Sequence, residues 1–221
     1  MLTHWRKAVF ALSLAAFPGQ AQEILARLDR SAPAFKAAQA AVRTVMHTAV
    51  INEDETQTGS MTIKKDAPRK LRFLIAFTGE NAFTAVLGAQ TVEIYRPKIG
   101  EIEEWDIRKY RDMAQRLFLL GFGTAGSELA ENYEIHDVRQ ETIESQLTTH
   151  LELTPKSPDV LKQLKKVELW ISEKNLCPVQ QKFYLPAGDY RVVTFSNLQL
   201  NPNLPGSAFD LPKSAKRIKK N

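Results

Sequence analysis

The sequence predicts an α+β fold in which a single domain is built on one long antiparallel sheet. Runs rich in β-branched and aromatic residues, separated by turn residues, indicate roughly ten strands with hairpin-like spacing. Helical patterns occur mainly near the N-terminus, over residues 23–41, and in an insertion over residues 108–131. The chain has 221 residues, 43% of them hydrophobic and 25% charged, which is typical of a globular protein that buries a core. A sheet with so many strands has to curl or close.

The first residues have the pattern of a secretory signal peptide. A basic pair at residues 6–7 precedes an apolar run over residues 8–17, Pro18 and Gly19 are expected to end any helix there, and small residues lead up to Ala21. The apolar run is too short to span a bilayer. We therefore expect cleavage after about Ala21, export to the periplasm and a single domain over residues 22–221. No cysteine lies near this point, so lipid attachment is not expected there.

Two helical segments carry apolar residues at the spacing of one helix face. In the first segment, Pro33 is expected to divide one helix from an alanine-rich second helix that reaches residue 41. The apolar residues are Ile24, Leu25 and Leu28 in the first segment and Met113, Leu117, Phe118 and Leu120 in the second.

The alternation of apolar and polar residues along the predicted strands leaves two interpretations of the apolar face open. They are predicted over residues 42–51, 58–64, 69–78, 83–87, 91–95, 99–105, 133–138, 146–154, 167–173, 179–185 and 190–200. One side of the third strand carries Leu71, Phe73 and Ile75, and one side of the ninth carries Leu169 and Ile171. Such a face suits a filled core as well as the lining of a hollow barrel that holds a ligand.

Motifs for catalysis or cofactor binding are weak. The run from Gly121 to Gly126 matches G-x-G-x-x-G, but it follows a helical pattern and has no βαβ unit, so we interpret it as a flexible corner. The three histidines after the signal are isolated in sequence, and Cys177 is the single cysteine. We expect no enzyme activity, metal, cofactor or nucleic-acid binding. Only a cluster of His150, a carboxylate and Ser127 would indicate a hydrolase.

The C-terminal residues 213–221 form a basic tail. Its cations are Lys213, Lys216, Arg217, Lys219 and Lys220. A solvated, disordered tail is the first expectation. The alternative is transient attraction to an anionic membrane surface, worth about 1 kcal/mol per cation.

Taken in order, the strand motifs resemble those of the LolA-type family of periplasmic outer-membrane lipoprotein carriers. The resemblance covers nearly the whole chain after the signal. The segments that carry it are Gly59–Lys64 followed by Pro68 and Leu71–Phe73, Val92–Pro97, Phe118–Gly123 with Glu128–Leu129, Val167–Ile171, Tyr190–Val192, Phe195–Ser196 and Ala208–Pro212. No single segment is specific, but their order and spacing are.

The resemblance implies an unclosed antiparallel β-barrel of roughly ten to eleven strands, with a helical lid over an apolar cavity. It implies a monomeric carrier that takes acylated lipoproteins from an inner-membrane ABC-type release complex to an outer-membrane acceptor. The expected cavity residues are Leu71, Phe73, Ile75, Ile94, Leu169 and Ile171, and the expected lid residues are Leu28, Phe118 and Leu119. Ala67 stands where family members have a lid-latching arginine before Pro68, so Lys65 or Arg69 is the candidate latch. Carriers of other lipids or glycolipids, and a signalling or scaffold module with a filled core, remain alternatives.

Overall fold

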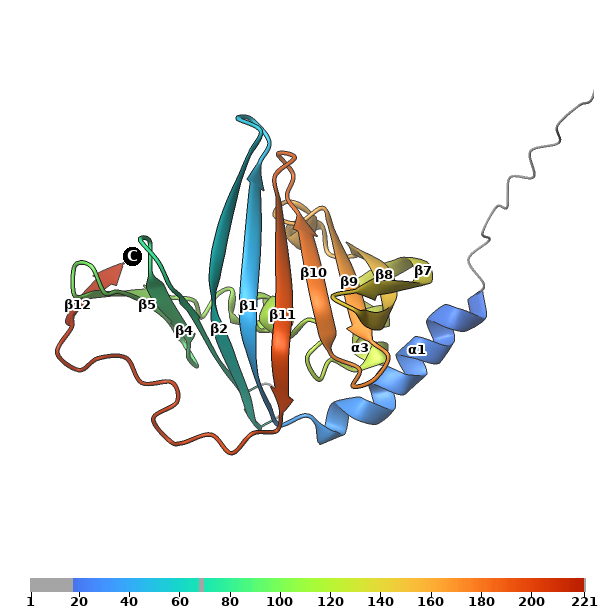
Figure 1. Ribbon diagram of the computed structural model, residues 1–221, viewed down its shortest axis with the longest axis horizontal. Helices are drawn as coiled ribbons and strands as arrows, with labels where there is room; N and C mark the ends of the chain where they lie inside the picture. Colours follow the sequence, from blue (N-terminus) through green and yellow to red (C-terminus); the bar gives the residue numbers. More distant parts are fainter. Residues whose placement is uncertain (1–17, 68–69, 221) are drawn as a thin grey trace, which may run out of the picture.

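A computed structural model describes residues 18–67 and 70–220 (Figure 1). Its strands form one sheet in the order β12-β6-β5-β4-β3-β2-β1-β11-β10-β9-β8-β7. The strands are β1 (Ala37–Thr48), β2 (Glu53–Ala67), β3 (Lys70–Phe77), β4 (Phe83–Leu87), β5 (Thr91–Arg96), β6 (Glu101–Asp106), β7 (Tyr133–Ile143), β8 (Gln146–Pro155), β9 (Lys166–Ser172), β10 (Pro178–Tyr184), β11 (Tyr190–Leu200) and β12 (Lys216–Lys220). The edge strands β12 and β7 are not paired with each other, which confirms the predicted α+β fold with an unclosed sheet. The described residues form twelve strands rather than ten or eleven.

Helices occupy the start of the chain and the connection between β6 and β7, with one more short helix after β8. They are α1 (Pro18–Ser31), the short 3₁₀ helix η1 (Ala32–Ala34), α2 (Arg111–Leu119), α3 (Gly126–Asn132) and α4 (Pro158–Leu161). The expectation that Pro18 and Gly19 end a helix of the apolar run 8–17 falls on residues outside the described part of the chain, and the first described helix, α1, begins at Pro18. A proline is tolerated in a first helical turn, where its missing N–H would have no partner. The predicted signal residues 1–17 lie outside the described part of the chain.

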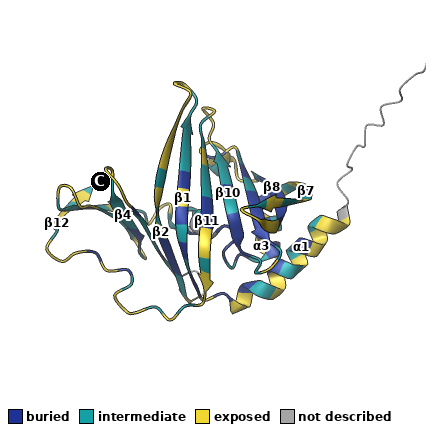
Figure 2. Cartoon of the chain, in the orientation of Figure 1, coloured by how far each residue is buried: buried dark blue, intermediate teal, exposed yellow. Residues whose placement is uncertain are grey.

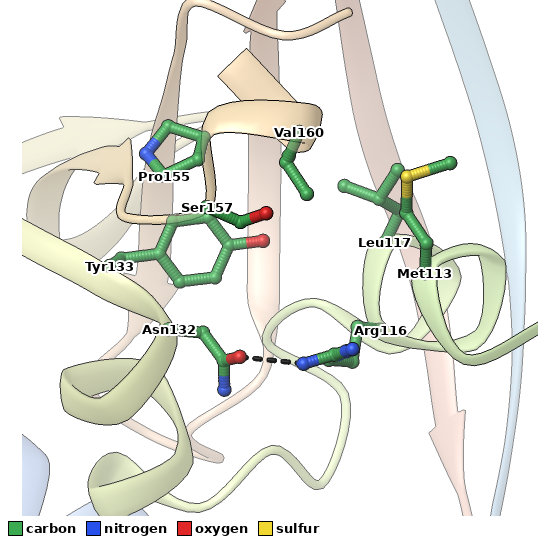
Figure 3. A pocket seen from close by; sticks show the side chains of 8 residues that line it. All are labelled: Met113, Arg116, Leu117, Asn132, Tyr133, Pro155, Ser157 and Val160. Carbon is green, nitrogen blue, oxygen red and sulfur yellow. Dashed lines mark hydrogen bonds between the residues drawn. The ribbon is translucent and has the colours of Figure 1, made fainter. Parts of the chain in front are cut away.

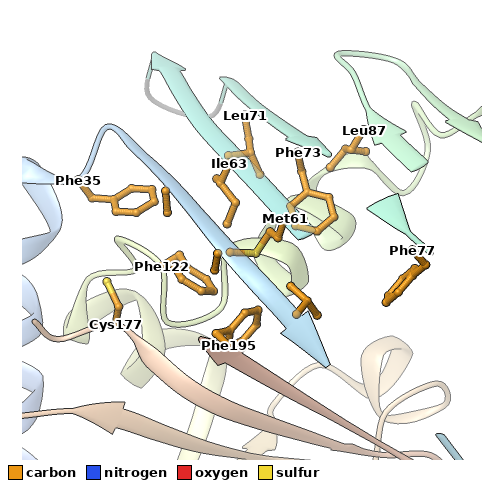
Figure 4. Close-up of a cluster of buried hydrophobic side chains, with 13 residues drawn as sticks. Phe35, Met61, Ile63, Leu71, Phe73, Phe77, Leu87, Phe122, Cys177 and Phe195 are labelled. Carbon is orange, nitrogen blue, oxygen red and sulfur yellow. The ribbon is translucent and has the colours of Figure 1, made fainter. Parts of the chain in front are cut away.

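The alanine-rich segment after Pro33 is a strand, so the predicted second helix was wrong. β1 begins at Ala37, and Ala38 and Ala40 are buried in the same cluster as Phe35 and Phe122. Figure 4 shows the two rings in this cluster. Alanine has the highest helix propensity, but propensity is a weak prior that tertiary packing overrides. Small side chains at these positions leave room for the two aromatic rings beside the strand.

The connection between β6 and β7 crosses one face of the sheet, which we call the inner face. In Figure 1 it passes behind the central strands β1 and β11. Two buried clusters lie on the inner face. The first gathers residues of β1–β4 and β11 around Phe122, and the second gathers residues of α1, α3 and β7–β9 around Leu120. The connection therefore contributes a core residue to each cluster.

The basic tail is an ordered strand, so the expectation of a disordered tail was wrong. β12 pairs in parallel with β6, whose acidic residues lie beside its cations. Lys216 lies 3.4 Å from Glu101, and Arg217 forms an ion pair with Glu93. The preceding segment packs on the outer face, where the Arg72 guanidinium lies 4.7 Å from the centre of the Phe209 ring. Charge complementarity with β6 thus gives the tail a place in the sheet.

Candidate binding face of the sheet

The expected cavity residues all lie on the inner face, but they divide into a covered and an uncovered group. Figure 2 shows the buried residues gathered along the central strands and β8–β10. Four members are buried, namely Leu71, Phe73, Leu169 and Ile171. The other two, Ile75 and Ile94, are half-buried and lie in register through Ala85 of β4.

Leu169 and Ile171 are covered by the protein's own chain. Both are 0% exposed and share their cluster with Leu28 of α1 and with Leu120. A Cβ atom added at Gly121 would lie 3.3 Å from the Cδ1 atoms of both residues, so the backbone after α2 rests on them. This part of the inner face is a filled core in the structure.

The covering segment is Leu120–Thr124, which we call the bridging loop. Gln181 of β10 donates a hydrogen bond from Nε2 to the carbonyl of Leu120 at 2.5 Å. The Gly121 N–H donates to Thr124 Oγ1 at 3.2 Å. The Gln181 bond is buried, where hydrogen bonds are strong because water does not compete. The bridging loop is therefore fixed both to the sheet and within itself.

Phe122 fills the centre of the first cluster. Its ring centre lies 5.0 Å from that of Phe195 in an edge-to-face arrangement and 6.5 Å from that of Phe35. Next to it, Gly123 has a positive φ of 64°, and an added Cβ would lie 2.5 Å from the Phe35 ring. Only glycine fits this position. The glycine run forms a corner after α2, as expected, and its glycines at 121 and 123 also allow close packing.

The inner face of β4–β6 is less completely covered. Val92 and Ile94 of β5 are half-buried, and Trp105 of β6, which is in register with Val92, is 40% exposed. These residues continue the apolar face of Phe73 and Ile75 toward the β12 edge. The inner face thus offers an apolar surface of which one part is filled by the bridging loop and the other is partly open.

α1 is tied to the sheet by an ion pair that sequence reasoning missed. Arg27 Nη1 lies 2.5 Å from Glu173 Oε2, and its Nη2 donates to the Glu173 carbonyl at 3.1 Å. Burial raises the pKa of Glu173, but hydrogen bonds from Thr149 and Arg27 outweigh it and hold the pKa below its usual value. The partners are 146 residues apart in sequence, so no local pattern could reveal them.

α1 is also joined to α3. Asp29 accepts hydrogen bonds from the Ser127 N–H at 2.9 Å and the Ser127 hydroxyl at 2.8 Å, which lower the pKa of Asp29. A Cβ added at Gly126 would lie 2.1 Å from the Leu25 carbonyl oxygen, so glycine permits the close approach of the two helices. α1, α3 and the bridging loop together form the cover of the inner face.

The structure describes the remaining expected lid and latch residues only in part. Phe118 and Leu119 belong to α2, and their side chains lie outside the described part of the structure. Arg69 also lies outside it. Lys65 lies at the end of β2, in register with Leu71, and within the described residues it has no carboxylate at ion-pair distance.

A small cavity lies between α2 and the ends of β8 and α3 (Figure 3). Its volume is about 70 Å³, and Met113, Leu117 and Val160 form its apolar side. Arg116 closes another side by donating to Asn132 Oδ1 at 2.7 Å. This is room for roughly two water-sized groups, far less than an acyl chain needs.

The structure does not assemble the one arrangement that would indicate a hydrolase. His150 is buried, with Nδ1 3.2 Å from the Asp137 carbonyl oxygen, whereas Ser127 is hydrogen-bonded to Asp29. Burial lowers the pKa of His150 and raises that of Cys177 to about 12, so the thiol stays protonated. Among the described residues, no group of three or more histidine, cysteine or acidic side chains is placed to hold a metal ion. No helix in the same part of the chain is long and apolar enough to span a membrane.

Comparisons with known proteins identify the fold. No protein-family model and no curated protein matches the sequence. An uncharacterized conserved protein from Thermus thermophilus is 14% identical, with 90% of this chain and 99% of that chain covered and a TM-score of 0.56. MucB, whose crystal structure is known, is 13% identical, with 90% of this chain and 65% of that chain covered and a TM-score of 0.54. The Mycobacterium tuberculosis lipoprotein LppX is 14% identical, with 86% of this chain and 99% of that chain covered and a TM-score of 0.53. The chain thus shares its fold with these three solved structures, and it has the unclosed sheet that the sequence resemblance implied.

Proposed function

We propose that the protein is a periplasmic chaperone that binds the acyl chains of lipoproteins on the inner face of its sheet. The observation that carries this proposal is the division of the inner face. Ile75, Ile94 and Trp105 are partly exposed, and the neighbouring apolar residues are covered only by the chain's own bridging loop and helices. A LolA-like fold, the sequence resemblance and the signal-peptide pattern support the same proposal.

The covering loop explains how cargo can be bound and still released. An acyl chain of about fifteen methylene groups gains on the order of 12 kcal/mol when it leaves water. In this protein the chain would first contact the open surface around Ile94 and would then replace Phe122 and Leu120. Displacing buried side chains of that size costs about 3–5 kcal/mol each, which offsets part of the gain. Return of the bridging loop then favours release.

The proposed transport route follows from the resemblance. The cargo is received from an inner-membrane ABC-type release complex and delivered to an outer-membrane acceptor, and no catalytic step is required. Contact with either membrane surface is transient. The ion pair of Arg27 with Glu173 takes the place of a latch by holding α1 over the covered half of the face.

Native mass spectrometry of the protein purified from the periplasm of its own host tests this proposal. We expect an acylated protein in the complex, which extraction then identifies. The variant Ile94→Glu places a charge on the open part of the face and should abolish acyl binding without disturbing the buried core. The control Thr91→Glu adds the same charge to the same strand at an outward-facing position. Acyl binding that is unchanged in Ile94→Glu would remove this surface from the site.

A second candidate is an envelope binding module whose core stays filled. The burial of Leu169 and Ile171 under the bridging loop favours it, and MucB, which shares the fold, has been solved in complex with MucA. Free phospholipid or glycolipid in the mass spectrum would instead indicate a lipid carrier. Persistently empty protein, together with a wild-type bridging loop that protects its amides from exchange, would support the filled module.

A further inference from the structure

A cleft with a volume of about 450 Å³ lies where β1 begins and where β2 and β11 end. In Figure 1 these three strand ends meet at the lower edge of the sheet. The cleft is lined by Lys36, Ala37, Lys64, Lys65, Asp66, Asn201, Pro202, Asn203 and Leu204. It is separate from the covered part of the inner face and from the small cavity beside α2.

Positive charge predominates around this cleft. Asp66 is the single carboxylate of its lining, and it already accepts two hydrogen bonds from Arg72 at 2.8 and 3.1 Å. Lys64 lies 3.7 Å from the same carboxylate. Lys36 and Lys65 have no carboxylate at ion-pair distance within the described part of the chain. The cleft therefore carries more positive charge than Asp66 can neutralise.

The backbone holds Lys36 and Lys65 on neighbouring segments. The Lys65 N–H donates to the Lys36 carbonyl at 2.8 Å. Asn201 Oδ1 accepts from the N–H groups of Lys36 and Ala37 at 2.8 and 3.1 Å, and its Nδ2 donates to the Ala34 carbonyl at 3.0 Å. Like charges on adjacent strands are unfavourable unless an anion lies between them. The site is thus organised before any ligand arrives.

The position of the cleft relates it to the apolar inner face. Lys65 is in register with Leu71, and Ile63 lies two residues before it on the same side of β2. Leu71 and Ile63 are buried, so a ligand whose charged group lies at Lys36 and Lys65 reaches the inner face with its apolar part once the cover of the first cluster is displaced, as the proposed function requires. We infer that this cleft binds the phosphate or an equivalent anionic group of a lipid headgroup. The apolar part of this inference rests on the proposed function, whereas the charge argument is independent of it.

Titrations followed by amide NMR, with two probes, test the inference. The probes are inorganic phosphate and dihexanoylphosphatidylglycerol below its micelle concentration. We expect both to shift the amides of Lys36, Lys65 and Asn201, and the lipid to bind at least tenfold more tightly. The double variant Lys36→Gln/Lys65→Gln should weaken lipid binding roughly fivefold for each lysine, or about twenty-fivefold in total. The control Lys98→Gln/Lys174→Gln removes the same charge from two exposed positions outside the cleft and should bind like the wild type.

The outcomes separate this inference from the proposed function. Equal affinity for phosphate and for the lipid would overturn the headgroup assignment and indicate a site for free phosphate. Equal weakening in the test and control variants would overturn the site itself, because only bulk charge would then matter. A fluorescent fatty acid that binds the wild type and the Lys36/Lys65 variant alike would support the apolar face. Failure of the fatty acid to bind either protein would contradict the proposed function and leave the phosphate result to be judged separately.

Discussion

Replacing Phe122 by alanine tests whether the bridging loop occupies the place of a ligand. Phe122 is 1% exposed, and its ring lies between Phe35 and Phe195. Removing a fully buried phenylalanine costs about 3–5 kcal/mol of unfolding free energy, and the lost edge-to-face contact with Phe195 favours the upper part of that range. A urea denaturation curve measures the loss. Tyr110→Ala, which removes a 53% exposed ring from the same connection, should change stability by no more than about 0.5 kcal/mol.

The same variant should bind acyl chains more tightly. In the wild type a ligand must displace the Phe122 ring, and in the variant this cost is absent. If at least about 1.4 kcal/mol of the displacement cost of about 3–5 kcal/mol falls on the ligand, the affinity for a fluorescent fatty acid rises at least about tenfold. Lower stability together with higher affinity is the expected signature. Unchanged or weaker fatty-acid binding in a folded Phe122→Ala protein would refute the idea that the loop and the ligand compete.

Three further predictions concern the cover of the inner face and the edge of the sheet. Gly126→Ala forces a Cβ against the Leu25 carbonyl oxygen and should cost about 1–3 kcal/mol, with faster hydrogen exchange in α1 as the local readout. Burial raises the pKa of Glu173, but its hydrogen bonds hold the pKa below the usual value of 4.5. The stability that this carboxylate contributes is therefore complete above pH 4.5. That contribution is lost as the pH falls from 4.5 through the lower pKa of the folded protein, and the melting temperature of Arg27→Gln should therefore depend less on pH in this window. Arg217→Gln should lower stability by at most about 1 kcal/mol at low salt, and its effect should vanish in about 1 M NaCl, because the ion pairs of β12 are partly exposed. A salt-independent loss in Arg217→Gln would show that packing, not charge, holds the edge strand.

The inner face shows how far the site could be predicted from the sequence. Alternation placed Leu71, Phe73 and Ile75 on one side of their strand and Leu169 and Ile171 on one side of theirs, because a strand presents every second residue to one face, and Ile94 came from the family resemblance. Neither could separate the half-buried Ile94 from the fully buried Leu169. That difference depends on Leu120 and Phe122, which reach the sheet from a connection whose path is fixed by long-range contacts.

Two sequence expectations failed for the same physical reason. Ala38 and the alanines around it favour a helix locally, but their burial against Phe122 makes the segment a strand. The cations of the tail favour disorder locally, but the acidic strand β6 gives them partners. In both cases the deciding contact lies far away in the sequence.

The sequence by itself determined the class of the fold, the approximate position of most strands and the apolar side of each strand, since these follow from local residue patterns. Only the tertiary structure decided how the inner face is used. The Arg27–Glu173 ion pair, the bridging loop over Leu169 and the cluster of Lys36 with Lys65 each join segments that are distant in the chain. These contacts stabilise the protein through burial and charge between segments that only folding brings together. No local pattern in the sequence therefore reveals them.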